Sequence, residues 1–68
     1  MQNAMGDELN DAQAELVKAY RTIEDVLRNR AEELAPYEAR NATKALAALW
    51  QVMNGLDMEP GQLYELGA

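Results

Sequence analysis

The chain has 68 residues, a formal net charge of −6, and neither cysteine nor histidine. This length restricts it to one small domain, and the missing residue types exclude disulfide bonds and metal centres built on thiolate or imidazole ligands. The acidic balance argues against binding to phosphate backbones or anionic lipid surfaces, because both are recognised by clustered Lys and Arg.

Residues 1–6 are expected to be a disordered lead-in to one helical domain at 7–66, which ends in a frayed pair at 67–68. No stretch approaches the roughly 18 consecutive apolar residues that a membrane span needs. The first residues also lack the basic and apolar regions of a signal peptide. We therefore expect a cytoplasmic protein that does not use a membrane.

One apolar stripe dominates the first half of the chain, and its members are spaced three and four residues apart. This spacing predicts an α-helix over residues 7–34, capped by Asp7 or Asn10. The stripe consists of Leu9, Ala12, Leu16, Ala19, Tyr20, Ile23, Leu27, Ala31 and Leu34. One helix cannot bury this stripe, so another helix or another chain has to cover it. Val17 lies away from the stripe, as an ordinary exposed residue or as part of a second contact face.

Arg30 is the polar exception, because its helical phase places it inside the apolar stripe. The interpretation we favour is that its aliphatic stem covers apolar surface while its guanidinium group reaches water near the helix end. The alternative is that Arg30 meets a carboxylate across an interface and fixes the register of the partner.

Pro36 marks the boundary between two helices, because proline lacks an N–H group and disfavours the helical conformation at Ala35. We expect a tight break at this point and a second helix over residues 36–54, with one long kinked helix as the alternative. The apolar stripe of the second helix consists of Ala39, Ala42, Leu46, Leu49, Trp50 and Met53. Gly55 is expected to end this helix in the left-handed conformation, with Leu56 folding back onto it.

Pro60 follows a turn and predicts a short C-terminal helix over residues 60–66, because proline fits the first turn of a helix. The fold class is therefore all-α, a helical hairpin plus a short third helix. Small domains without disulfides or metals are commonly stabilised by association. We accordingly expect a homodimer, with the helices of two copies forming a four-helix bundle.

The sequence offers no constellation of residues that supports catalysis. Enzymes need a base of tuned pKa in a pocket, and this chain pairs no nucleophile with a base. Adjacent acids such as Glu24 and Asp25 point about 100° apart on a helix, so they are interpreted as solvated surface. We expect no catalytic residue, no cofactor, no metal and no small-molecule substrate.

The leading hypothesis is a small non-enzymatic interaction or regulatory module, which binds a second copy or another protein through apolar helix faces. The residues assigned to this interface are Leu16, Tyr20, Ile23, Leu27, Arg30, Trp50 and Met53. One alternative is an acidic inhibitor that mimics nucleic acid on a basic protein surface, suggested by the acidic ends of the chain. The other is nucleic-acid binding through the mid-section between Lys18 and Lys44, which holds all the basic residues. Nucleic acid is the least expected partner, because acids are interleaved there.

Overall fold

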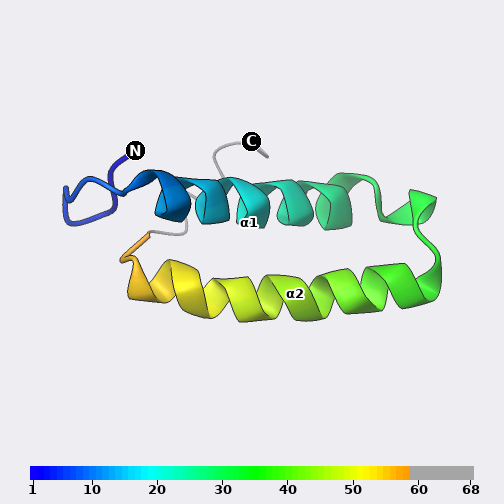
Figure 1. Cartoon of the computed structure of the whole chain (residues 1–68). Helices are drawn as coiled ribbons and strands as arrows, with labels where there is room; N and C mark the ends of the chain where they lie inside the picture. Colours follow the sequence, from blue (N-terminus) through cyan, green and yellow to red (C-terminus); the bar gives the residue numbers. More distant parts are fainter. Residues whose placement is uncertain (59–68) are drawn as a thin grey trace.

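The computed structural model describes residues 1–58, which fold into two antiparallel α-helices (Figure 1). Helix α1 spans Asp11–Asn29 and helix α2 spans Pro36–Gly55, with the short 3₁₀ turn η1 at Ala31–Glu33 between them. The predicted all-α class and the helical hairpin are confirmed, and the alternative of one long kinked helix is wrong. The third helix expected over residues 60–66 lies outside the described residues.

Helix α1 begins at Asp11 because Asn10 caps it. The Asn10 Oδ1 atom accepts a hydrogen bond from the Gln13 backbone N–H at 2.8 Å, and the Gln13 Oε1 atom accepts one from the Asn10 N–H at 2.9 Å. This reciprocal capping box satisfies two backbone donors at the start of the helix. Of the two caps proposed from the sequence Asn10 is the one used, and the predicted start at Asp7 is wrong.

Helix α1 ends at Asn29, and the predicted continuation to residue 34 is also wrong. The axes of two packed helices lie about 8–10 Å apart, and one extended residue spans at most about 3.6 Å. A break at Ala35 alone cannot cross that distance. The chain therefore leaves the helix at Arg30 and passes through η1, and then through Leu34 and Ala35 in extended conformations.

Helix α2 begins with Pro36 at its first position, as the sequence predicts. Proline is suited to this position because the first backbone N–H groups of a helix have no intrahelical partner. The Glu38 Oε1 atom accepts a hydrogen bond from the Ala35 backbone N–H at 2.7 Å, which satisfies the donor just before the helix.

The C-terminus of α2 differs in detail from its prediction. Gly55 is still helical, and Asp57 is the residue with a left-handed backbone, at φ 59°. The Asp57 N–H donates to the Asn54 carbonyl and the Met58 N–H donates to the Met53 carbonyl, both at 3.1 Å. These two bonds define a Schellman motif, in which the residue after the left-handed one folds back. Met58 takes the place that the sequence assigned to Leu56.

The core lies at the open end of the hairpin, where the first half of α1 meets the second half of α2. Its buried apolar side chains are Leu9, Val17, Tyr20, Met53 and Met58. The partly exposed residues that pack against it are Leu46, Leu49, Trp50, Val52 and Leu56. Both turns next to the helices contribute to the core, since Leu9 precedes α1 and Met58 follows α2.

The segment before α1 is a loop that lies against the end of α2, at the left of Figure 1. The Asn3 side-chain amide donates a hydrogen bond to the Leu56 carbonyl at 2.8 Å, and the Ala4 N–H donates to the Asp57 carbonyl at 2.9 Å. The sequence indicated a disordered lead-in for most of this segment. In the structure this segment donates hydrogen bonds to carbonyl groups just beyond the last turn of α2 and leads Leu9 into the core.

We expect Gly55→Ala to raise the free energy of unfolding by about 0.5–1 kcal/mol, because alanine loses less backbone entropy than glycine in a helix. A Cβ atom at Gly55 meets nothing within 4 Å. Thermal denaturation at fixed concentration measures the change. Gly6→Ala is the control, since Gly6 has equal space but a φ of +83°, and this variant should be destabilised. Stabilisation by both variants would contradict the two backbone conformations.

Candidate interaction surface

An open apolar groove of about 300 Å³ runs between the two helices. Its lining residues are Tyr20 of α1 and Thr43, Leu46, Ala47 and Trp50 of α2. The Tyr20 and Trp50 rings have their centroids 6.1 Å apart and are tilted by 37°. This separation lies within the range of about 4.5–7 Å at which aromatic rings attract one another. The ring pair therefore forms a firm wall of the groove.

The structure brings together only part of the interface predicted from the sequence. Tyr20 and Trp50 both line the groove. Met53 has no accessible surface, so it supports the helix pair from within and is not available to a partner. Ile23 and Leu27 are half-buried on α1 and do not line the groove.

The buried side of α1 shares Tyr20 with the predicted stripe but is rotated away from the rest of it. Val17 is completely buried, whereas its neighbour Leu16 remains 41% exposed. The interpretation of Val17 as an ordinary exposed residue is therefore wrong, because Val17 packs in the core shared with α2. The spacing of Val17, Tyr20 and Glu24 is also three and four residues, which places them on one helix face. A charged residue in the middle of that face concealed it from the hydropathy pattern.

Glu24 is a buried carboxylate, which corrects its interpretation as solvated surface. Its Oε1 atom lies 2.7 Å from Nη2 of Arg28, one helical turn further along α1. A charged group enters a protein interior only when a counter-charge or hydrogen bonds compensate for the lost water. The spacing of four residues between Glu24 and Arg28 was the sequence signal for this pair.

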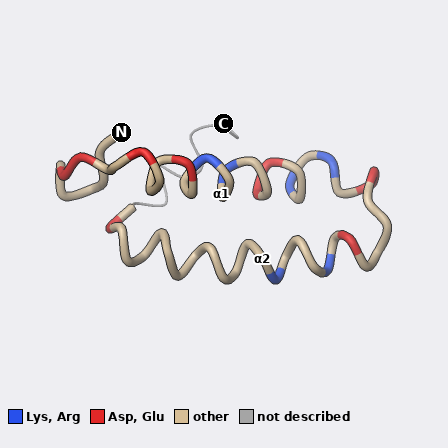
Figure 2. The backbone as a smooth tube through the Cα atoms, viewed as in Figure 1, with Lys and Arg blue, Asp and Glu red and all other residues tan. Residues whose placement is uncertain are grey.

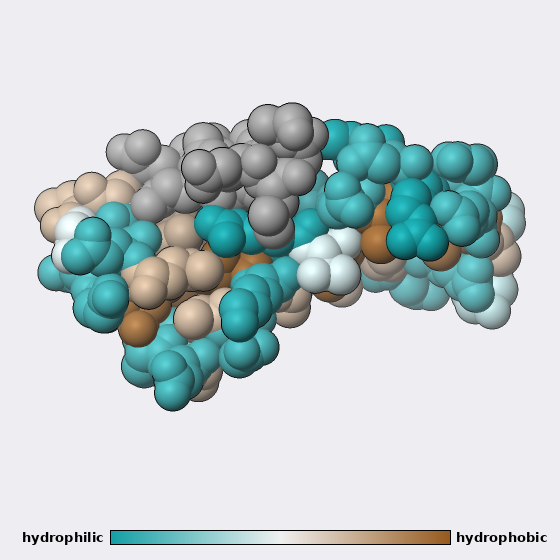
Figure 3. Space-filling view, turned by 90° about the horizontal axis from the view of Figure 1, so that it is seen from above, coloured by the Kyte–Doolittle hydropathy of each residue, from teal (hydrophilic) through white to brown (hydrophobic). Residues whose placement is uncertain are grey.

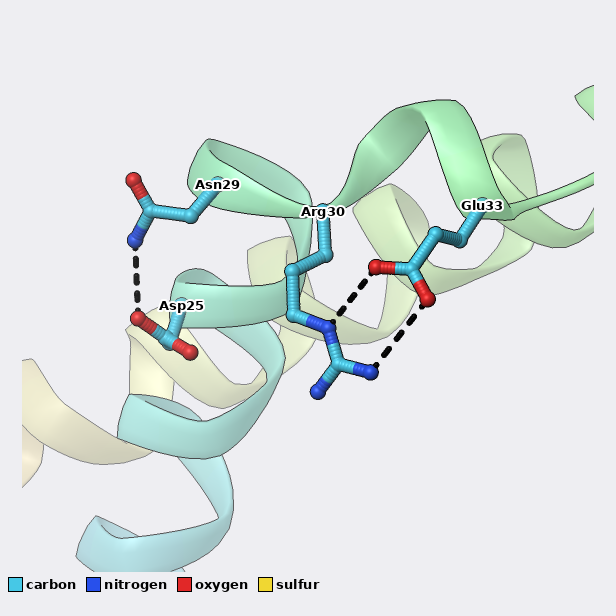
Figure 4. A network of polar contacts seen from close by, with 4 residues as sticks. All are labelled: Asp25, Asn29, Arg30 and Glu33. Atoms are coloured by element: carbon cyan, nitrogen blue, oxygen red, sulfur yellow. Dashed lines mark hydrogen bonds and ion pairs between the residues drawn. The ribbon is translucent and has the colours of Figure 1, made fainter.

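Arg30 lies beyond the end of α1, so its helical phase no longer places it on the stripe. Its Nε atom donates a hydrogen bond to Oε2 of Glu33 at 3.0 Å, while Asn29 donates to Asp25 at 2.8 Å (Figure 4). The hydrogen bond and the charge of Glu33 raise the pKa of Arg30, and the same contact lowers the pKa of Glu33. Arg30 thus braces η1 within its own chain, and its side chain is exposed instead of covering apolar surface.

A second hollow, of about 320 Å³, lies against α1 and is more polar than the groove. Its lining residues are Arg21, Thr22, Asp25, Val26 and Arg30. Asp25 and Arg30 already bond to neighbours in their own chain. This hollow therefore offers less for an external ligand than the apolar groove does.

Charge is distributed unevenly over the hairpin (Figure 2). Helix α2 carries Glu38, Arg40 and Lys44 in its first half, and the next charged residue is Asp57. The groove residues of α2 therefore lie within a helix that is largely uncharged. Removing an uncharged surface from water carries a much smaller penalty than removing ionised groups, so this part of α2 is suited to contact.

Apolar side chains also reach the surface outside the groove. Figure 3 shows hydrophobic atoms between hydrophilic ones, toward the left and toward the right of that face. The large apolar residues that stay exposed are Met1, Met5, Leu16 and Tyr37. Scattered exposed residues of this kind are normal on protein surfaces and carry no function by themselves.

Two other kinds of site, a membrane span and a cluster of metal ligands, are not found within the described residues. Within residues 1–58 neither helix combines the length and the apolar character needed to cross a bilayer. In the same range no three acidic side chains come together as a set of metal ligands. No protein-family model, no curated protein and no solved structure matches this chain, so the function has to be inferred from the geometry.

We expect Val17→Ala to lower the free energy of unfolding by about 1.5–3 kcal/mol, because it removes two buried methyl groups and leaves a cavity. Leu16→Ala should cost less than about 1 kcal/mol, since Leu16 is partly solvated. Urea denaturation of both variants at low protein concentration compares these costs. A larger loss for Leu16→Ala would show that the sequence stripe, and not Val17, faces the core.

The pKa of Glu33 is expected to lie below that of an ordinary glutamate, because Arg30 stabilises its ionised form. The contribution to stability is present above the ordinary glutamate pKa and is lost as the pH falls through the lowered value. Carbon-detected NMR titration of the Glu33 carboxyl measures this. Arg30→Ala should return the pKa to the ordinary range, and an unchanged pKa in that variant would rule out the Arg30 contact as the cause.

Proposed function

We propose that this protein is a small interaction module without enzymatic activity, which binds a protein surface through the groove beside Tyr20 and Trp50. The observation that carries the proposal is the position of Trp50, half-buried in an open apolar groove on the uncharged part of α2. Tryptophan and tyrosine are enriched among the residues that contribute most to binding at protein interfaces. A helical segment of the partner is the expected occupant, because the groove follows the direction of α2.

The packing within one chain supports this proposal. The core seals Val17 and Met53 completely, but it leaves Leu46, Leu49 and Trp50 partly exposed. Apolar surface contributes about 25 cal/mol per Å² when it is removed from water. A partner that covers this region would therefore gain affinity without having to displace charged groups.

The acidic-inhibitor alternative relies on the acidic ends of the chain, and at the N-terminal end Asp7, Glu8, Asp11 and Glu15 are all exposed. Two of these carboxylates already have a positive neighbour. The Met1 amino group lies 3.6 Å from Glu8, and Lys18 Nζ lies 3.2 Å from Glu15. This pairing reduces the negative field that a nucleic-acid mimic needs. We therefore rank the acidic inhibitor below the module that binds through its apolar groove.

The nucleic-acid alternative needs basic side chains that are available for phosphates. Instead, Lys18, Arg28 and Arg30 pair with acids on neighbouring turns of the chain, at 3.2, 2.7 and 3.0 Å. Three of the six Lys and Arg residues therefore already pair with acids. This alternative ranks last.

Site-specific photo-crosslinking in the cells that produce the protein tests the proposed function. A benzophenone amino acid replaces Thr43, which lines the groove, and in a matched control it replaces Asn41. Both positions are exposed, and they lie about 200° apart around α2. We expect a crosslinked protein, identified by mass spectrometry, from position 43 and not from position 41.

The same crosslinker at position 43 in an Ala47→Arg background gives a second readout. Arginine places bulk and charge in the groove, so the crosslinked product should fall by at least roughly tenfold, the effect of about 1.4 kcal/mol on binding. Equal yields from positions 41 and 43, or no protein product from position 43, would refute the proposed function.

A further inference from the structure

We infer that the occupant of the groove is a second copy of this chain, whose α2 packs antiparallel to the first α2 across a twofold axis. The inference rests on the proposed function, because it uses the same groove. It adds the identity of the partner, the relative direction of the helices and the residue register between them.

The groove side of α2 continues from Arg40 to Asn54 as a seam with steps of three and four residues, the spacing by which one helix contacts another. The seam residues are Arg40, Thr43, Ala47, Trp50 and Asn54 in the helix, together with Asp57 in the left-handed turn that follows it. Trp50 is partly buried and the other five are exposed. The seam is therefore accessible from Arg40 to the turn that follows α2.

The seam is complementary to itself when a second copy runs in the opposite direction. The antiparallel register that places Ala47 opposite Trp50 of the second copy also places Thr43 opposite Asn54 and Arg40 opposite Asp57. The bulkiest seam residue thus meets the smallest, a hydroxyl meets an amide, and a cation meets an anion. Each contact occurs twice, because a twofold axis presents the same patch on both copies.

The charged residues favour an antiparallel pair of α2 helices over a parallel pair. Arg40 and Asp57 are exposed at opposite ends of the seam, and neither belongs to an ion pair within residues 1–58. A parallel pair would bring like charges together at both ends and would set two tryptophans against each other. The antiparallel pair avoids both conflicts and opposes the two helix dipoles favourably.

Steric fit explains why a single chain leaves this groove open. The groove is lined by the small residues Thr43 and Ala47 beside the packed rings of Tyr20 and Trp50. Trp50 of the second copy would fill the space above Ala47, and the first copy's Trp50 would fill the equivalent space in return. The groove is therefore completed by the partner, which supplies the missing aromatic wall.

Sedimentation equilibrium of the full chain tests the self-association. We expect the wild type to approach twice its mass of 7.6 kDa as its concentration rises. Ala47→Arg should weaken the dimer at least roughly tenfold, the scale of a change at an interface hot spot. Ala45→Arg is the matched control, because Ala45 is also exposed but lies about 160° away around the helix. Helical circular dichroism of both dilute variants verifies that the monomer still folds.

Charge-reversal and cysteine variants test the register between the two α2 helices. Arg40→Asp and Asp57→Arg should each weaken the homodimer, while an equimolar mixture of the two variants should associate, because each then offers the opposite charge to the other. The chain has no cysteine, so Thr43→Cys mixed with Asn54→Cys should form a disulfide-linked heterodimer under oxidation. Efficient crosslinking of Thr43→Cys with itself would show a parallel pair and overturn the inference.

The two proposals fail in different ways. A wild type that stays monomeric, combined with capture of a different protein from position 43, overturns the self-pairing and leaves the proposed function in place. A crosslinker at position 43 that captures neither a second copy nor any other protein overturns both. A dimer that is equally weakened by Ala47→Arg and Ala45→Arg would place the contact on another face and would overturn the inferred seam.

Discussion

Burial of apolar surface at one end of the hairpin is the constraint on which the structure depends. Val17 and Met53 lose all their accessible surface there, and the flanking turns add Leu9 and Met58 to them. The other end carries no equivalent cluster among the described residues, and Tyr37 remains 59% exposed beside the connection. The groove lies next to this core, where Tyr20 and Trp50 pack together while Thr43 and Ala47 stay exposed.

Local polar contacts hold this end of the molecule together. The Asn10 capping box fixes where α1 begins, and the left-handed Asp57 turns the chain so that Met58 reaches the core. The Asn3 amide then ties the N-terminal loop to the end of α2. A cap contributes about 1 kcal/mol, a large share of what a domain of this size can accumulate. These contacts therefore determine where the helices begin and end at this side of the hairpin.

The sequence predicted correctly those features that depend on a single residue, such as the start of α2. It failed for features that depend on contacts with neighbouring residues. Pro36 and Asn10 act through their own backbone or side chain, so their roles were predictable. Tyr20 and Trp50 were assigned to the interface as members of the two apolar stripes. Gly55 was favoured as the left-handed residue by its type, but burial of Met58 shifted the turn to Asp57.

The buried face of α1 was missed for a related reason. A hydropathy stripe counts Glu24 as polar, whereas its contact with Arg28 allows it to lie buried on the same helix face as Val17. The helix end at Asn29 likewise removed Arg30 from the stripe, because the connection to α2 needs several residues.

The contrast between the two helices favours apolar contact over electrostatic recognition. Helix α1 places acids and bases one turn apart, as Glu15 with Lys18 and Glu24 with Arg28, and these charges pair within the chain. Helix α2 has no charged residue between Lys44 and Asp57, so its groove side gains little from remaining in water. Salt screens exposed charges but not the burial of apolar area. An interface centred on Trp50 would therefore keep most of its affinity at high ionic strength, and salt would act only through the Arg40 and Asp57 ends of the seam.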